Sequence, residues 1–242
     1  MVANVVGSEA PYEGVAINGV QNICEVLESL QKTRELKELI RQRLSEFEEL
    51  GRVGAASFDF KPFLNLSLKA SLKSEVAFCL STANSSAISG LKFQKALEDK
   101  ALESIDVEDL AELLRRAEVR FYERKASYIK EALRNFSLVE DALKLNSYEA
   151  RKALVSDVKG MGYKEASHLL RNVGRKDIAI LDRHILRFLH TFGYIDCVPN
   201  HVSQKEYLKF ERVFSIIGSS LDMNLAELDL YLWYKATGKV LK

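Results

Sequence analysis

Two side chains with reactive chemistry, Lys164 and Asp182, lie close together in the sequence. Lys164 follows a short glycine-containing turn, and Asp182 comes eighteen residues later, directly after the apolar run 178–181. A lysine amine is a nucleophile when its surroundings favour the neutral form, and a nearby carboxylate can stabilise positive charge and move protons. Aspartate is also a preferred cap for a helix that begins at Arg183, and the two roles are compatible. The pair predicts covalent chemistry on an electrophilic carbon.

The turn before Lys164 holds Gly160 and Gly162 and has helical sequence on both sides. Glycine permits a positive φ, which we expect at both positions, and it lets the backbone come close to a ligand. The amides of the turn and of the following helix start would then converge on an anion, most naturally a phosphate. Lys159 adds a positive charge there. The segment near 150–173 is therefore predicted to form a helix-hairpin-helix that grips a nucleic-acid backbone.

Basic side chains gather around this turn, although the formal net charge of the whole chain is only +1. Residues 159–187 carry seven Lys/Arg against three acidic residues, whereas residues 21–50 carry five against seven. A surface that faces a DNA duplex needs such a local excess. A solvated helical face explains an excess of this size equally well.

The composition is that of a globular protein, with 47% hydrophobic and 29% charged residues. Cys24, Cys79 and Cys197 fit no zinc or disulfide spacing, which favours a reducing, intracellular setting and no metal site. The chain has no apolar run of about 18 residues that would predict a membrane helix, and its N-terminus lacks the layout of a signal peptide. We therefore expect an intracellular protein.

Helical periodicity dominates the chain, and only three prolines interrupt it. Apolar residues recur every three or four positions over 22–50, whereas 54–69 lose this period and are expected to form a loop with room for a short extended piece. Ser203 and Asn224, each with a Glu three residues later, predict capping boxes. Further helices are expected near 72–83, 87–99, 107–118, 120–135 and 148–157. The predicted fold class is all-α.

Three segments carry a resemblance to a known family: the hairpin KGMGYKEASHLLRNVG, the aspartate segment ILDRHILR and the C-terminal DLYLWYKATGKVLK. They resemble the helix-hairpin-helix/Gly-Pro-Asp DNA glycosylases, and most closely the archaeal-type 8-oxoguanine DNA glycosylase/AP lyase branch. The resemblance covers roughly residues 21–242 and leaves 1–20 as an N-terminal extension of unknown role. Lys159 stands where many hairpins carry proline, and Ile180-Leu181 replace the Gly-Pro that names the superfamily.

The resemblance implies two helical subdomains with the hairpin flanking a DNA-binding cleft. It implies a monomer that binds damaged double-stranded DNA and excises 8-oxoguanine, with Lys164 as the nucleophile that forms a Schiff base to the sugar. Asp182 would handle charge and protons, and β-elimination would cut the strand 3′ to the abasic site. Some relatives hold an iron–sulfur cluster with four cysteines near the C-terminus, but no cysteine follows Cys197 here, so no cofactor is expected.

Base recognition is implied for Trp233 and for Lys242, nine residues further on. Trp233 would offer a stacking face, and Lys242 a cation with a free carboxylate; a core tryptophan and a frayed terminal lysine are the plain structural alternative. Ala83 takes the position where superfamily members often carry an Asn or Gln that fills the gap left by the flipped base. Either the neighbouring Asn84 takes over that role or discrimination of the opposite base is weak.

Two other functions fit parts of the pattern. One is a glycosylase for a different damaged base, such as an oxidised pyrimidine or an alkylated base. The other is a non-catalytic helix-hairpin-helix module that only holds DNA. A binding module does not need Lys164 and Asp182 together, and the presence of both favours the bifunctional enzyme.

Overall fold

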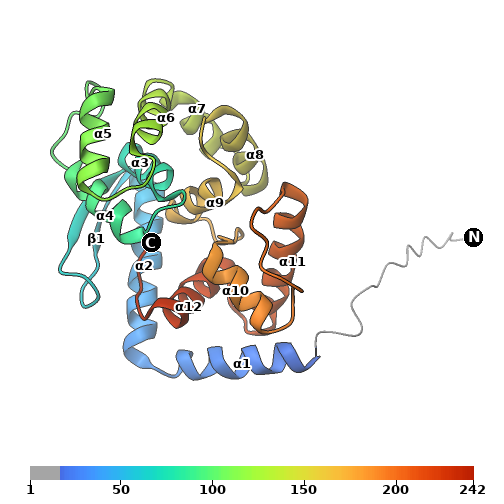
Figure 1. Cartoon of the computed structure of the whole chain (residues 1–242). Helices are drawn as coiled ribbons and strands as arrows, with labels where there is room; N and C mark the ends of the chain where they lie inside the picture. The colour runs from blue at the N-terminus through green and yellow to red at the C-terminus, as the bar shows by residue number, and fades with distance from the viewer. Residues whose placement is uncertain (1–16) are drawn as a thin grey trace, which may run out of the picture.

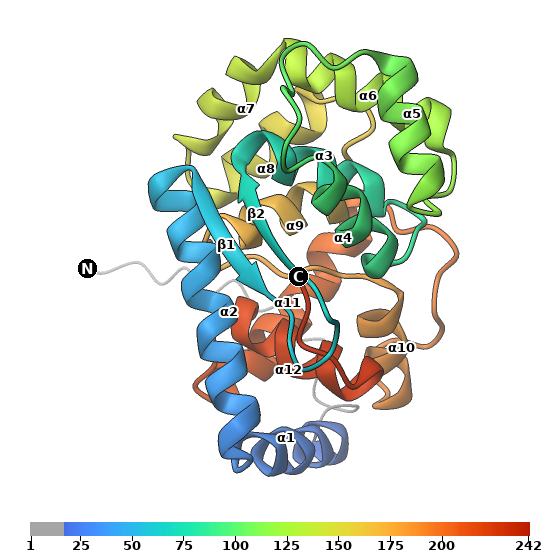
Figure 2. The same ribbon diagram turned by 90° about the vertical axis from the view of Figure 1, so that its left-hand side faces the viewer.

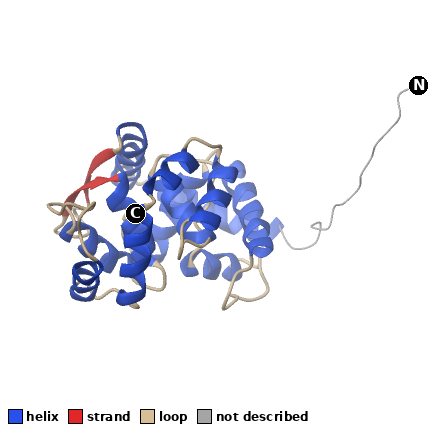
Figure 3. Cartoon of the chain, turned by 90° about the horizontal axis from the view of Figure 1, so that it is seen from above, coloured by secondary structure: helices blue, strands red, loops and turns tan. Residues whose placement is uncertain are grey.

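The computed structural model describes residues 17–242, with side chains from Ile23 onward. The N-terminal extension expected at 1–20 lies outside the described residues, apart from the backbone that begins the first helix. The described part folds into twelve helices and one two-stranded sheet (Figures 1 and 3). The all-α prediction is confirmed. The elements are α1 (Ile17–Gln31), α2 (Arg34–Val53), β1 (Ala55–Asp59), β2 (Ser67–Ser71), α3 (Leu72–Thr82), α4 (Ala87–Ala96), α5 (Val107–Arg116), α6 (Tyr122–Arg134), α7 (Phe136–Leu143), α8 (Ser147–Asp157), α9 (Tyr163–Asn172), α10 (Arg183–Thr191), α11 (Gln204–Ser220) and α12 (Leu225–Thr237).

The β-hairpin occupies most of the region predicted to be a loop. Gly54 ends α2 in the left-handed region with a φ of 81° and turns the chain into β1. The two strands pair antiparallel, with Phe58 opposite Leu68, and alternate residues of each strand are buried. This period of two is the pattern of a strand with one face on the core. The short extended piece expected within 54–69 is therefore a complete pair of strands.

The helices pack in two groups (Figures 1 and 2). Helices α3 to α9 pack on one another, with α3 in contact with α4, α6 and α9. Helix α1 packs on the C-terminal helices α11 and α12, and both α2 and α10 pack on α12. Contacts of α9 with both α2 and α3 join the groups. The hairpin between α8 and α9 is thereby held beside the segment that leads into α10.

Helix α7 has no counterpart among the predicted helices, which left 136–147 unassigned. Its short apolar face buries Phe136, Val139 and Ala142, spaced three residues apart. Asn135, with a φ of −104° and a ψ of 34°, interrupts the helical backbone between α6 and α7. One buried face of three residues is too weak a periodic signal to be recognised without the tertiary structure.

The predicted capping box is complete at α11 and only half formed at α12. Ser203 and Glu206 form both bonds of the box at α11. At α12, Asn224 accepts the amide of Glu227 at 3.0 Å, which is one half of the expected box. Separately, no helix in the described part of the chain is long and apolar enough to cross a membrane.

Candidate active site

The hairpin between α8 and α9 uses its two glycines differently. Gly160 has a φ of 84°, and a Cβ built there would lie 2.2 Å from Cδ2 of Tyr128, so both backbone and space require glycine. Gly162 is extended, with a φ of −90° and a ψ of −177°, so the prediction of a positive φ at both glycines is wrong for Gly162. It caps α9 instead: its N–H donates to Oε2 of Glu165 at 3.2 Å. A Cβ there would approach that oxygen to 3.0 Å.

Unpaired amides collect at the hairpin. The N–H groups of Gly160, Tyr163 and Lys164 have no acceptor among the residues that the structure describes. The first amides of a helix carry the positive end of the helix dipole and readily bind a phosphate. Lys159 lies beside them on the surface, with its Nζ 3.6 Å from a carboxylate oxygen of Glu131. The hairpin therefore has the form of an anion site with an accessible cation.

Lys164 and Asp182 each lie at the N-terminal end of a helix. Lys164 lies in the first turn of α9 with 27% of its side chain exposed, and its Nζ is 3.8 Å from Oε1 of Glu165. Asp182 caps α10, because its Oδ1 accepts the amides of His184 at 2.8 Å and Ile185 at 2.9 Å. Among the described residues, nothing donates to Oδ2 of Asp182. The helix cap thus fixes the carboxylate and leaves one oxygen available for chemistry.

Most of the residues singled out from the sequence meet at one place. Lys164, Asp182, Trp233 and Lys242 line an inner cavity of about 70 Å³. Three of them, Lys164, Asp182 and Trp233, also line an adjoining groove of about 730 Å³, to which Asn84 belongs. Residues from α3, α4, α9 and α12, together with Asp182 directly before α10, are thereby brought together around an amine and a carboxylate.

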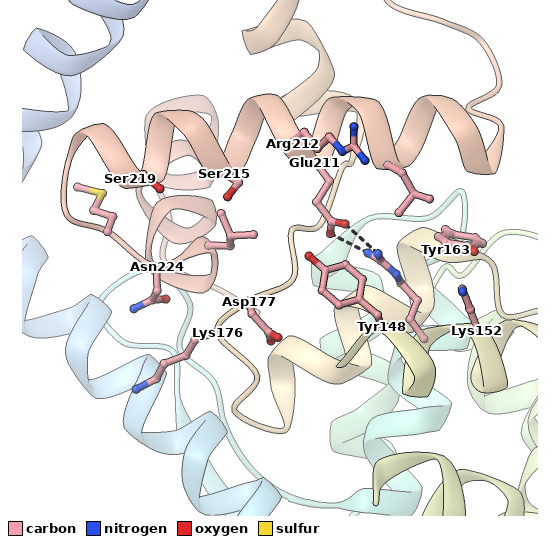
Figure 4. A pocket seen from close by; sticks show the side chains of 14 residues that line it. Tyr148, Lys152, Tyr163, Lys176, Asp177, Glu211, Arg212, Ser215, Ser219 and Asn224 are labelled. Atoms are coloured by element: carbon pink, nitrogen blue, oxygen red, sulfur yellow. Dashed lines mark hydrogen bonds and ion pairs between the residues drawn. The ribbon is translucent and has the colours of Figure 1, made fainter. Parts of the chain in front are cut away.

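The segment that leads into α10 is held by a buried hydrogen-bond network. The hydroxyl of Tyr207 donates to the carbonyl of Ala179 at 2.8 Å and accepts the amide of Leu181 at 3.1 Å. Glu211 accepts the amide of Ala179 at 3.0 Å and forms a two-bonded ion pair with Arg151 at 2.7 and 2.8 Å (dashed lines in Figure 4). Burial raises the pKa of Tyr207, so its hydroxyl stays protonated and able to donate. This network fixes a backbone that has no Gly-Pro to stiffen it.

Trp233, on α12, lines the inner cavity. Its ring meets that of His184 edge to face, with centroids 4.9 Å apart. Its indole Nε1 is buried and has no hydrogen-bond partner within the part of the chain that the structure describes. Buried indole N–H groups usually find a partner, so this one is available to a ligand.

Lys242 lies at the cavity in a way that sequence did not anticipate. Its ammonium donates to Oε2 of Glu75 at 2.6 Å and sits 3.9 Å from the ring centroid of Phe58. The side chain is completely enclosed, and the 4% exposure of the residue belongs to its main chain. Asn172 and Gln94 also donate to Glu75, which makes this carboxylate the centre of a buried cluster. The ammonium expected to contact the base is therefore already paired with Glu75. Only the main chain of Lys242 is left to face the cavity.

A second carboxylate in the inner cavity, Asp229, was not recognised from the sequence. It is buried, and it lies 3.6 Å from Nη2 of Arg171. Burial raises its pKa to about 7, opposed by the charge of Arg171 and reinforced by Asp182. The available signal was an acid one helical turn before Trp233, which places both on one face of α12.

The loop that carries Asn84 is anchored by another buried amine. Nζ of Lys125 donates to the carbonyl of Ser81 at 2.7 Å and to Oγ of Ser85 at 3.0 Å. Burial lowers the pKa of Lys125 to about 8, and the charge of Lys164 adds to the effect. Asn84 is exposed in the left-handed region with a φ of 53°. The anchored loop thus presents Asn84 at the groove.

A separate cavity of about 640 Å³ lies between α8, α11 and the start of α12 (Figure 4). Tyr148, Lys152 and Arg212 are among its lining residues, and the Arg151–Glu211 pair forms part of its wall. Lys164, Asp182, Trp233 and Lys242 do not line it, whereas Tyr163 of the hairpin does. The cavity therefore lies against the hydrogen-bond network that holds the segment before α10.

Comparison with known proteins gives one consistent family. Residues 53–223 match the family model described as 8-oxoguanine DNA glycosylase. The 8-oxoguanine DNA glycosylase/AP lyase of Methanocaldococcus jannaschii is 43% identical over 213 residues, which are 87% of this chain and 95% of the relative. The enzyme of the same description from Aquifex aeolicus is 40% identical over 233 residues, covering 93% of this chain and 100% of the relative.

Solved structures agree with this assignment. The crystal structure of the Methanocaldococcus jannaschii glycosylase/lyase in complex with a 15mer DNA containing 8-oxoguanine is similar with a TM-score of 0.79 and 37% identity. It matches 91% of this chain and 100% of that one. The 8-oxoguanine DNA glycosylase of Thermotoga maritima gives a TM-score of 0.80 at 34% identity, over 92% of this chain and 100% of that one.

Proposed function

The chain belongs to the family of 8-oxoguanine DNA glycosylases, and from that premise we propose that it excises 8-oxoguanine from double-stranded DNA and cleaves the strand at the abasic site. The observation that carries the proposal is the inner cavity. One small space behind a helix-hairpin-helix holds an amine, Lys164, and a carboxylate with a free oxygen, Asp182. A module that only held DNA would not need this pair.

Lys164 is the proposed nucleophile. Its neutral amine attacks C1′ of the flipped nucleotide, the bond from C1′ to the base breaks, and the base leaves with the electron pair and takes up a proton. The nitrogen lone pair then opens the sugar ring and forms an iminium to C1′. Loss of a proton from C2′ expels the 3′ phosphate, and water finally releases Lys164. The lyase step therefore requires an amine at this position.

Asp182 is the proposed partner. Its Oδ1 is fixed by two amides of α10, so Oδ2 can face the sugar without a change of rotamer. A carboxylate held there stabilises the positive charge that develops on the sugar as the base departs, and it can relay protons during the later steps. The Tyr207 and Glu211 contacts hold the backbone that delivers it.

The hairpin is the proposed phosphate site. The amides of Gly160, Tyr163 and Lys164 would bind a phosphate beside the lesion, with Lys159 as an accessory cation and Gly162 as the helix cap that orients them. Contacts to phosphate hold the duplex in register without reading its sequence. Asn84, exposed at the groove, is the proposed contact to the strand opposite the flipped base.

Trp233 and Lys242 are the proposed base-binding residues. Trp233 lies at both the inner cavity and the groove, so its ring can cover a base that passes from one to the other. The main chain of Lys242, rather than its ammonium, faces that base because the ammonium is paired with Glu75. We also infer that one copy of the chain suffices, since the four residues proposed for catalysis and base binding line one cavity of one chain.

Borohydride trapping tests the proposal. Three duplexes are compared, carrying a single 8-oxoguanine, an abasic site or no damage, with the wild type, Lys164→Gln and Asp182→Asn. We expect a covalent adduct on the first two duplexes that is lost in Lys164→Gln. An adduct on the abasic duplex alone would keep the lyase and reject 8-oxoguanine as the substrate. Binding without any adduct would instead identify a non-catalytic module.

A further inference from the structure

Unpaired buried polar atoms converge on the inner cavity. His168, Arg171 and Trp233 all line this cavity and carry buried nitrogens without a hydrogen-bond partner among the described residues: both ring nitrogens of His168, Nε and Nη1 of Arg171 and Nε1 of Trp233. Buried polar groups in folded proteins are nearly always paired, because an unmade hydrogen bond leaves the cost of dehydration uncompensated. Such a concentration around one small space indicates that a polar ligand completes these bonds.

His168 is the member of this set placed beside the reacting atoms. It follows Lys164 by four residues on α9, so the two side chains lie on the same helical face. His168 is the deeper of the two, with 5% of the residue exposed against 27% of the Lys164 side chain. The proposed reaction brings C1′ to the amine of Lys164, and a base that enters the inner cavity comes within reach of His168, because both residues line that cavity.

The protonation state of His168 fits a contact with a neutral base. Burial, followed by the positive charges of Arg171, Lys164 and Lys242, holds the pKa of His168 well below its ordinary value. The main chain of Lys242 is near enough to raise that pKa slightly, but no described residue meets either nitrogen at hydrogen-bonding geometry. A neutral imidazole offers one donor and one acceptor. The edge of an oxidised purine, with N–H groups and carbonyl oxygens, matches both.

The ring is also held in place independently of any ligand. Phe78 meets it edge to face with centroids 5.3 Å apart. Arg171 is less suited to reading a base, because its guanidinium lies over Phe47 at 4.6 Å and near Asp229 at 3.6 Å. His168 is thus packed against Phe78, and among the described residues nothing forms a hydrogen bond to its two ring nitrogens.

We propose that His168 is a specificity-determining residue that hydrogen-bonds the extruded base inside the inner cavity. This inference rests on the proposed function, since it assigns a contact to the same substrate. It adds a base contact from the helix that carries the nucleophile, so recognition and attack are coupled through the rigid α9.

An abasic duplex separates this role from a structural one. The test compares single-turnover excision of 8-oxoguanine with strand cleavage at a preformed abasic site, where no base is present to be contacted. For His168→Leu we expect excision to fall about 10- to 100-fold, the effect of an unmade buried hydrogen bond, while cleavage of the abasic duplex stays within about twofold. His168→Gln, which keeps a donor and an acceptor, should recover most of the loss.

The matched control is Tyr231→Phe, which removes another buried and unpaired polar atom that does not line the cavity. It should leave both rates unchanged. Equal losses on the two duplexes in both His168 variants would overturn the inference, because they would indicate a structural role. Unchanged excision in His168→Leu would also overturn it. A wild type that cleaves only the abasic duplex would show instead that the proposed substrate is wrong, and the role for His168 would fall with it.

Discussion

Two neighbouring residues on α9 face opposite kinds of buried polar environment. Ser167 accepts a hydrogen bond from Arg151 at 3.2 Å, within a cluster in which Arg151 is further paired with Glu211. His168, the next residue, lines the inner cavity, and nothing in the described residues forms a hydrogen bond to either of its ring nitrogens. The polar groups near Ser167 therefore have hydrogen-bond partners within the described part of the chain, whereas those of His168 do not. These two sides of α9 are called the paired side and the incomplete side below.

The difference separates positioning from binding. The paired side fixes backbone: Glu211 and Tyr207 hold the segment that ends in Asp182. The incomplete side leaves donors and acceptors available at a place where an amine and a carboxylate already meet. Since buried polar groups without partners destabilise a fold, their retention at one cavity is best explained by a ligand that satisfies them.

Replacing Lys164 by Gln should produce the largest change of all, and only in activity. Because glutamine cannot form an imine, we expect strand cleavage to fall on the order of a thousandfold or more. The side chain is partly exposed and its nearest acid lies at 3.8 Å, so the free energy of unfolding should change by less than about 1 kcal/mol. Quenched-flow cleavage assays and urea denaturation measure the two quantities on the same samples. A large loss of stability in Lys164→Gln would contradict the view that the incomplete side of α9 serves binding and chemistry rather than the fold.

Removing a partner from the paired side of α9 should instead mainly lower the free energy of unfolding. Glu211→Ala leaves Arg151 as an unpaired buried charge and the amide of Ala179 without its acceptor, so we expect a destabilisation of about 3–5 kcal/mol. Arg212→Ala, next in sequence but exposed, is the matched control and should change stability by no more than about 0.5 kcal/mol. Denaturant unfolding measures both. Similar values for the two variants would mean that the network contributes little to holding the Asp182 segment.

The sequence was informative where chemistry depends on local pattern. The hairpin, Lys164 and Asp182 could be proposed because glycine spacing, a helix start and a capping aspartate are local signals. Glu75 and Asp229 could not, because their importance comes from burial against residues far away in the chain: Glu75 meets Lys242 across 167 positions.

Lys242 also shows that the sequence alone does not reveal which buried groups are paired. Its type and place near Trp233 suggested a cation for the base, but only packing reveals that Glu75 already holds this cation. The β-hairpin was underestimated for a related reason: strand pairing across 54–71 involves partners that a helical period does not register.

Asp229 offers a smaller and pH-dependent test of the incomplete side. Its pKa of about 7 means that it gains charge beside Asp182 and Lys164 as the pH rises through neutrality. That charge would favour the positive sugar, so we expect wild-type cleavage to rise several-fold between about pH 6 and pH 8. Asp229→Asn should lack this step. Single-turnover rates across the range decide it, and an unchanged profile would exclude Asp229 from the reaction.

The same shift has a defined sign for stability. Because the pKa of Asp229 is raised on folding, the fold favours its protonated form. The stabilisation from that form is complete below the ordinary pKa near 3.8 and is lost as the pH rises through about 7. Asp229→Asn should therefore flatten the fall in thermal stability across this window, which differential scanning calorimetry at several pH values can measure.

The smallest effect is expected outside both clusters, at Lys159. Its side chain is 61% exposed and paired only weakly with Glu131, so Lys159→Ala should leave stability within about 0.5 kcal/mol. If it contacts a phosphate, DNA affinity should fall only a few-fold, equally for damaged and undamaged duplexes, and the slope of log affinity against log salt should lessen by about one. Fluorescence anisotropy titrations at several salt concentrations measure that slope. A loss confined to the damaged duplex would contradict a phosphate contact, because the hairpin amides and Lys159 would then be reading the lesion instead of holding the backbone.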